Sequence, residues 1–157
     1  MTPTTPTLTV AQVKRLGLKH DQPKREPGEL IACFARGRLV NGKNASRGWQ
    51  MKAWGRYKRV WRAQTLDALL MANADRGPIA RGSDATPKVV TFHAIVPSRF
   101  DSDGLALACA PIRDALITAG VIDDDRDSAG HSFTYTQEAR RKAGTVYGVF
   151  VRVRLRG

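Results

Sequence analysis

The sequence predicts a small α+β domain with two main helices. Three segments, 29–35, 89–96 and 149–156, have the apolar and β-branched composition of strands. Two further segments, 49–71 and 105–120, carry apolar residues at helical spacing. With 157 residues, the chain is long enough for one domain with a buried core.

The N-terminal residues 1–28 are expected to form a flexible arm with a short helix, ahead of a folded domain at 29–157. Thr9 can cap this short helix and Gly17 can end it. The competing interpretation is a disordered tail without a role.

The first long helix is predicted over 49–71. Trp54, Tyr57 and Trp61 recur there at helical spacing. Aromatic residues in such a pattern either pack in the core or stack on exposed bases. We expect Trp54 and Trp61 to lie inside.

The strand predicted at 89–96 ends at Pro97, and a second helical stretch follows it. Its apolar stripe has spacings of four, three and four residues, which is typical of an amphipathic helix; the stripe consists of Leu105, Cys109, Ile112 and Leu116. Pro111 predicts a kink or a restart within this helix, and Gly120 predicts its end.

The C-terminal segment 149–156 alternates apolar residues with arginines. This alternation predicts a half-exposed strand with a basic outer face that carries Arg152 and Arg154.

The charge balance points to a polyanionic partner. The chain has 26 Lys and Arg against 14 Asp and Glu, a formal net charge of +12. Nucleic acid is the default partner of such a chain, because phosphates attract cations whatever the base sequence; an anionic membrane surface is the weaker alternative. From Leu30 to Leu66 there are nine basic residues and no acid.

The compartment is expected to be cytoplasmic. No apolar run approaches the ~18 residues of a membrane span, and the N-terminus lacks the pattern of a signal peptide. Cys33 and Cys109 lie in apolar contexts and are expected to be buried free thiols.

Acidic residues gather at two places in this basic chain. Asp101 and Asp103 follow the strand at 89–96 at even spacing, so on an extended segment both can face one metal ion. Asp124 or Asp125 can add a third carboxylate if the intervening helix packs back onto the strand. The alternatives are a helix N-cap at Asp103 and a solvated turn at 123–127. Together, in a basic chain, the acids predict a magnesium site that acts on phosphodiesters.

Three motifs taken together resemble the RusA-type Holliday junction resolvases, a family common in phages and prophages. The motifs are Asp101-Ser102-Asp103-Gly104-Leu105, Pro111-Ile112-Arg113-Asp114-Ala115-Leu116 and Ala119-Gly120-Val121-Ile122-Asp123-Asp124-Asp125. The resemblance covers residues 89–126, and the basic loop and helix upstream also fit. Residues 1–28 have no recognised counterpart.

The resemblance implies a RusA-like fold, with a small mixed β-sheet packed with two main helices, in a homodimer. It also implies an enzyme, a Mg²⁺-dependent endonuclease that resolves four-way DNA junctions in recombination and repair, with Mn²⁺ as an alternative ion. Asp101, Asp103 and Asp125 match the catalytic, metal-binding aspartates, and Asp124 is an adjacent metal candidate. The residues expected to contact DNA are Arg36, Arg38, Lys43, Arg47, Lys52, Arg56, Arg59, Arg62, Arg113, Arg152 and Arg154.

Two positions depart from the family pattern. Gly104 stands where Asn is usual, and Leu107 stands where the family often has a functional Lys; a shifted position holds Ala110. Arg113 can supply the positive charge or pair with the acids. These departures favour an alternative function, a non-catalytic protein that binds branched DNA and retains the fold. A third interpretation, an RNA-binding or assembly protein, rests only on the charge.

Overall fold

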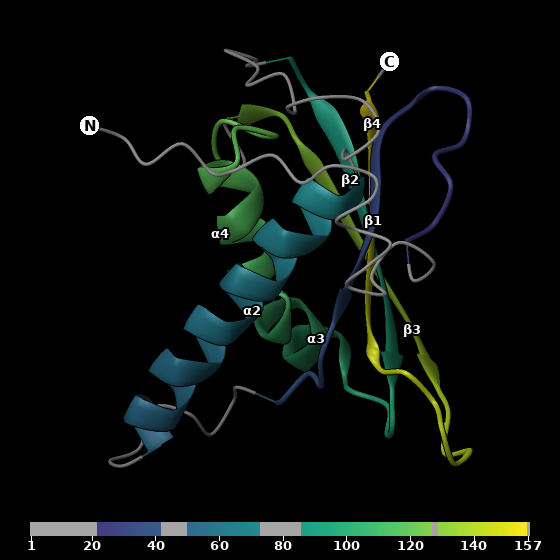
Figure 1. The fold of residues 1–157 in the computed structure, drawn as a ribbon. Helices are drawn as coiled ribbons and strands as arrows, with labels where there is room; N and C mark the ends of the chain where they lie inside the picture. The colour runs from purple at the N-terminus through teal and green to yellow at the C-terminus, as the bar shows by residue number, and fades with distance from the viewer. Residues whose placement is uncertain (1–21, 42–49, 73–85, 127–128, 157) are drawn as a thin grey trace.

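The computed structural model describes residues 22–41, 50–72, 86–126 and 129–156 (Figure 1). Four strands and three helices occur in these segments. In chain order they are β1 (Glu29–Arg36), α2 (Gln50–Ala72), β2 (Lys88–Val96), α3 (Ser102–Ala108), α4 (Ala110–Thr118), β3 (Ser132–Ala139) and β4 (Gly148–Leu155).

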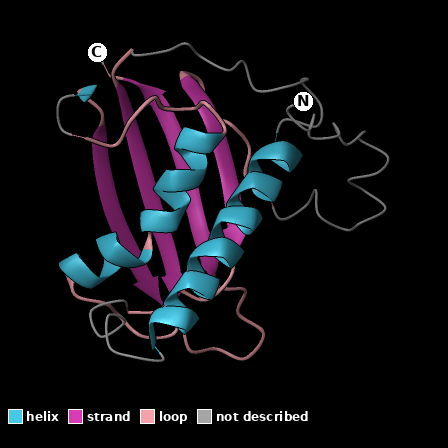
Figure 2. Cartoon of the chain, turned by 90° about the vertical axis from the view of Figure 1, so that its left-hand side faces the viewer, coloured by secondary structure: helices cyan, strands magenta, loops and turns pink. Residues whose placement is uncertain are grey.

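The strands form one mixed sheet in the order β1-β4-β2-β3. β4 pairs antiparallel with both β1 and β2, whereas β2 and β3 are parallel. All three helices cover one face of this sheet (Figure 2). The predicted α+β class, with a mixed sheet packed against helices, is therefore confirmed.

The helical stretch after β2 is two consecutive helices rather than one. α3 ends at Ala108, with Cys109 as its C-cap. α4 begins at Ala110 and has Pro111 in its first turn. Pro111 has no backbone N–H to donate, so it suits the first turn of a new helix. The predicted restart at Pro111 is confirmed.

The core lies between the helices and the inner face of the sheet. Alternate residues of β2 and β4 point into it, because strand side chains alternate between the two faces. The predicted stripe on α3 and α4 is buried, with Leu105, Cys109, Ile112 and Leu116 each at most 3% exposed. Cys33 and Cys109 are buried free thiols as predicted, and burial raises the pKa of each to about 12.

α2 is fixed to the domain by its aromatic side chains. Trp61 is 2% exposed, and its indole N–H donates to the Arg38 carbonyl at 3.3 Å. The Tyr57 hydroxyl donates to the Ala108 carbonyl at 2.9 Å, which ties α2 to α3. Trp54 is half-buried and stacks on Tyr57, so it covers the core edge rather than lying inside as expected.

Part of the N-terminal arm lies on the outer edge of β1. The Gln22 side-chain amide donates to the Phe34 carbonyl at 3.1 Å, and its oxygen accepts from the Phe34 N–H at 2.9 Å. This pair of bonds satisfies backbone groups that an edge strand would otherwise leave open. The short helix predicted near Thr9–Gly17 lies outside the described residues. No helix in the described segments is both long and apolar enough to cross a membrane.

The start of β4 requires a glycine because Phe34 lies across it. A Cβ on Gly148 would meet the Ala35 carbonyl and would lie 2.5 Å from the Phe34 ring. We expect Gly148→Ala to lower the free energy of unfolding by about 1–3 kcal/mol, as overpacking does elsewhere.

The control for this prediction is Gly55→Ala on α2, where an added Cβ would lie 4.0 Å from a guanidinium nitrogen of Arg59. Alanine there should stabilise the helix by about 0.5–1 kcal/mol. Chemical denaturation of both variants measures the contrast. Equal unfolding free energies for the two variants would contradict the close packing of Phe34 on β4.

Candidate functional site

Asp101 and Asp103 lie just after β2, at the start of α3, and both are exposed. Asp101 is the N-cap of α3, and its Oδ1 accepts a hydrogen bond from the Gly104 N–H at 2.9 Å. Asp103 lies in the first turn, where a carboxylate is favoured by the helix dipole. The N-cap is therefore Asp101 and not Asp103, because the helix begins two residues earlier than that alternative assumed.

Gly104 allows a close approach at this acidic pair. A Cβ at this position would lie 2.5 Å from Asp101 Oδ1 and 3.3 Å from Asn41 Oδ1. Gly104 thus leaves room for both side chains. Asn41 joins the acidic pair as a polar neighbour that sequence reasoning did not identify.

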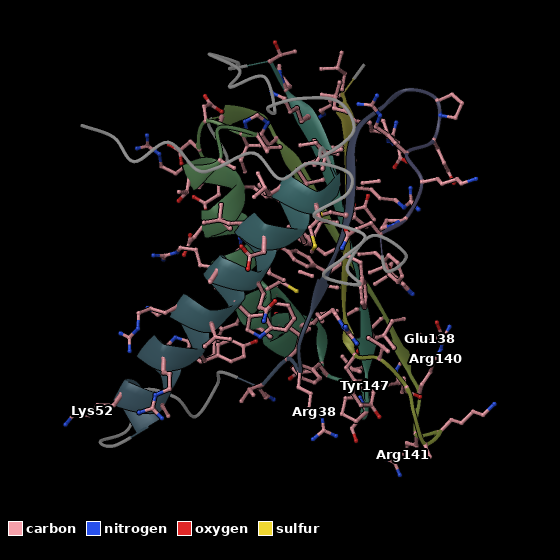
Figure 3. All side chains as sticks on the ribbon, in the orientation of Figure 1. Arg38, Lys52, Glu138, Arg140, Arg141 and Tyr147 are labelled. Carbon is pink, nitrogen blue, oxygen red and sulfur yellow. The ribbon has the colours of Figure 1, made fainter. Side chains whose placement is uncertain are left out.

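Cationic side chains surround this end of the sheet. Residues 140–147, the connection from β3 to β4, pass the end of β2, where the Arg140 N–H donates to the Val96 carbonyl at 2.9 Å. Arg141 donates from Nε to the Pro97 carbonyl at 3.3 Å, on the segment that leads to Asp101. Arg38 lies over the Tyr147 ring, 5.1 Å from its centre. Figure 3 shows Arg38, Arg140 and Arg141 at the same end of the molecule, with Lys52 of α2 also toward that end.

The second acidic group, Asp123 to Asp125, lies between α4 and β3. Asp123 accepts from Nε2 of the buried His131 at 2.5 Å, while His131 Nδ1 accepts from the Lys88 N–H at 3.1 Å. Since Nδ1 is an acceptor, Nε2 carries the proton. The hydrogen bond from His131 is the largest cause that lowers the pKa of Asp123. Asp124 accepts from the Arg126 N–H and guanidinium, which lowers its pKa as well.

Asp125 lies beside a half-buried arginine. Arg113 Nε is 3.9 Å from Asp125, and its guanidinium donates to the Tyr135 hydroxyl. The same guanidinium lies over the Phe133 and Tyr135 rings, at 5.9 and 5.8 Å from their centres. Of the two roles considered for Arg113, the structure shows a long ion pair with an acid, and Arg113 Nε makes no hydrogen bond to a described residue.

Contacts along one face of β3 connect the two acidic groups. The Phe100 backbone, next to Asp101, bonds to the Gln137 side chain at 2.8 and 2.7 Å. Gln137 and Tyr135 are two residues apart on β3 and so point to the same face, and Tyr135 leads through Arg113 to Asp125. Within the described segments, no three or more His, Cys, Asp or Glu side chains lie close enough together to hold a metal. The described acids thus form two separate groups.

The arginines and lysines predicted to bind DNA are mostly exposed. Exposed residues in this set are Arg36, Arg38, Lys52, Arg56, Arg59, Arg62 and Arg154. Arg62 lies 3.6 Å from Asp114, and Arg152 lies 2.5 Å from Glu29, so these two are ion-paired within the chain. Lys43 and Arg47 lie outside the described residues. Arg152 and Arg154 alternate with buried Val151 and Val153, which confirms the basic outer face of β4.

Arg38 and Arg56 also line a cavity of about 330 Å³ between α2 and the end of β1. Tyr57, Val60 and Trp61 form its apolar wall. The cavity therefore combines cations with aromatic surface.

Leu107 does not belong to the core. It is 39% exposed on α3, although Leu105 beside it is 3% exposed. Its side chain does not pack in the apolar stripe, because two residues along a helix turn it well away from Leu105.

Comparison of the sequence with known proteins assigns the chain to no family. No family model matches the sequence, and no curated protein matches it. The interpretation of the site therefore rests on its own residues.

Sequence reasoning missed several residues that shape the site. His131 lies 43 positions from its partner Lys88, and Gln137 lies 37 positions from its partner Phe100, so no local pattern marks them. The three consecutive cations Arg140, Arg141 and Lys142 were visible in the sequence as a charge run.

The bond between Asp123 and His131 predicts a pH dependence of stability. The pKa of Asp123 is lowered from its usual 3.8, so the stabilisation is present above that value and is lost as pH falls through the lower, folded-state pKa. Asp123→Asn removes this ionisation but keeps an acceptor for His131. The melting temperature of wild type should exceed that of Asp123→Asn near neutral pH, and the two should converge at strongly acidic pH. A difference in melting temperature that stays constant over the whole pH range would contradict a hydrogen bond from His131 to an ionised Asp123.

Proposed function

We propose that the protein is a Mg²⁺-dependent, structure-selective endodeoxyribonuclease of the RusA type that resolves four-way DNA junctions. One observation carries the proposal. Exposed Asp101 and Asp103 lie at the end of the sheet near which Arg38, Arg140 and Arg141 gather. A carboxylate pair among cations suits a divalent ion that meets a phosphate backbone.

The chemistry of the donors fits Mg²⁺. This ion prefers oxygen ligands and is usually held by one or two carboxylates together with water and substrate phosphates. Asp101 and Asp103 would hold it. Asp124 and Asp125, the other predicted ligands, belong to the second acidic group near the start of β3, so they would not share this ion. When bound, the ion supplies an activated water and offsets charge on the phosphate; Mn²⁺ would serve as an alternative.

The chain's own residues orient the acids and the DNA. The Gly104 N–H donates to one oxygen of Asp101. Arg113 lies 3.9 Å from Asp125 and donates to the Tyr135 hydroxyl. Lys52, Arg56 and Arg59 recur at i, i+4 and i+7 on α2, so they lie on one face of the helix and are exposed. Contacts from such residues to phosphates position a duplex without reading its sequence. Paired nicking of a four-way junction further requires two copies of the chain, so the proposal includes a homodimer.

A non-catalytic protein that binds branched DNA is the second candidate function. Leu107 offers no cation where the resemblance leads one to expect a lysine, and the described acids form two groups rather than one. The basic surface would serve either function.

Removing either carboxylate of the pair separates these two functions. Asp101→Asn and Asp103→Asn should each slow cleavage of a four-way junction by at least about 100-fold, because even residues that only orient metal ligands cost about 10–100-fold when lost. Binding of the junction without Mg²⁺ should be unchanged or slightly tighter, since negative charge near the phosphates is removed.

The matched control is Asp67→Asn, which removes an exposed carboxylate from α2. It should cleave at the wild-type rate. Full activity of the Asp101→Asn, Asp103→Asn double variant would overturn the assignment, whereas wild-type protein that binds junctions tightly but never cleaves them would establish the second candidate.

A further inference from the structure

The face of the sheet opposite the helices carries a row of aromatic rings. Phe34, Phe150 and His93 are direct neighbours across β1, β4 and β2 in the strand register. The Phe34 and Phe150 ring centres are 4.5 Å apart, and those of His93 and Phe150 are 6.4 Å apart. Phe34 is buried, whereas Phe150 and His93 are partly exposed, so these two rings give this face an aromatic surface outside the core cluster.

The His93 ring is held in place within this row. Its Nδ1 is 2.7 Å from the Thr136 hydroxyl, and its Nε2 is 3.7 Å from Glu138. His93 is a satisfied strand histidine, as is usual for this residue type, and its side chain is 39% exposed. The ring therefore presents a fixed face beside Phe150.

A cavity of about 560 Å³ opens on this face, where residues 140–147 pass over it. Phe34, Ile95 and Phe150 contribute from the sheet, and Arg140, Lys142 and Val146 contribute from the connection. Its volume lies within the ~300–1,000 Å³ of typical small-ligand pockets. Figure 3 shows Glu138 and Arg140 on the side of the sheet away from the helices.

Hydrogen bonds fix the cationic residues that form the wall of the cavity. Arg140 donates from two nitrogens to Glu138, at 2.9 and 3.0 Å, and the Tyr147 hydroxyl donates to the Arg140 carbonyl at 3.0 Å. The Thr145 hydroxyl donates to the Lys142 carbonyl at 2.6 Å and closes the turn that carries this lysine. Two cations, Arg140 and Lys142, line the cavity, and the one described acid beside them, Glu138, pairs with Arg140, so the rim is positive at Lys142.

We propose that this cavity binds an unpaired nucleotide of single-stranded DNA. The base would lie on the Phe150 ring, which lines the cavity next to His93, and Lys142 with Arg140 would bind the adjacent phosphate. Stacking accepts any base, since every base has a π-face, but bases in a duplex are already stacked on their neighbours. The choice of DNA over RNA rests on the proposed function. The proposal that the cavity binds a nucleotide does not depend on that function. The cationic rim disfavours the other occupants of an aromatic face, an apolar peptide or a second copy of this basic chain.

The test is fluorescence anisotropy with a labelled oligo(dT) of roughly eight nucleotides, a length within the site sizes known for single-strand binding proteins. Phe150→Leu keeps an apolar side chain but removes the stacking ring, and affinity should fall about 5- to 150-fold, which corresponds to the ~1–3 kcal/mol of one stacked base. Lys142→Ala should weaken binding and lower the salt dependence by roughly 0.7 units of slope. Lys142 is exposed, so this variant remains informative if Phe150→Leu fails to fold.

The matched control is Lys24→Ala, an exposed lysine near the opposite end of β1, which should bind as wild type does. Wild-type affinity in both Phe150→Leu and Lys142→Ala would overturn the proposal. Equal affinity for oligo(U) would overturn the choice of DNA, and a change in molecular mass with Phe150→Leu would assign the face to a second copy. The anisotropy assay is run in EDTA, where no Mg²⁺-dependent cleavage occurs. A failure to bind oligo(dT) therefore does not contradict the nuclease proposal, and a lack of cleavage does not contradict the nucleotide site.

Discussion

The parallel pairing of β2 with β3 is the constraint on which the arrangement of the acids depends. A parallel pair requires a connection that runs back along the strands, and α3 and α4 provide it. Asp101 and Asp103 therefore follow the end of β2, whereas Asp123 to Asp125 precede the start of β3. β2 has nine residues, and a strand of this length spans roughly 25 Å. Figure 1 shows α3 near the end of β2 and the end of α4 near the start of β3. Arg113 lies 3.9 Å from Asp125 and donates to Tyr135 on β3, but the two acidic groups remain near opposite ends of the parallel pair.

Most elements of the fold follow from local patterns, and the long-range geometry does not. The apolar stripe from Leu105 to Leu116 and the restart at Pro111 were predictable, because both depend on residues a few positions apart. The strand order, with β4 between β1 and β2, was not, since hydrophobic alternation fixes which face of a strand is buried but not its neighbour. At the site, the acids themselves were visible in the sequence. Their partners were not: Asn41, His131 and Gln137 reach them only through the fold.

The connection between β3 and β4 joins the two surfaces that the proposals use. Arg141 contacts Pro97 and Ser98, on the segment that leads to Asp101, while Arg140 and Lys142 line the aromatic cavity on the open face. A short run of cations thus extends from the acidic pair to the stacking surface. If both proposals hold, this arrangement would suit a DNA branch point, where duplex arms and unpaired nucleotides lie close together.

The central claim is that the acidic pair serves metal-dependent cleavage of branched DNA. It is tested most directly by incubating the wild-type protein with a labelled four-way junction and with a linear duplex of the same sequence, in Mg²⁺ and in EDTA. The account predicts paired nicks in the junction that require Mg²⁺, with little cleavage of the linear duplex. Cleavage that persists in EDTA, or equal cleavage of both substrates, would contradict it.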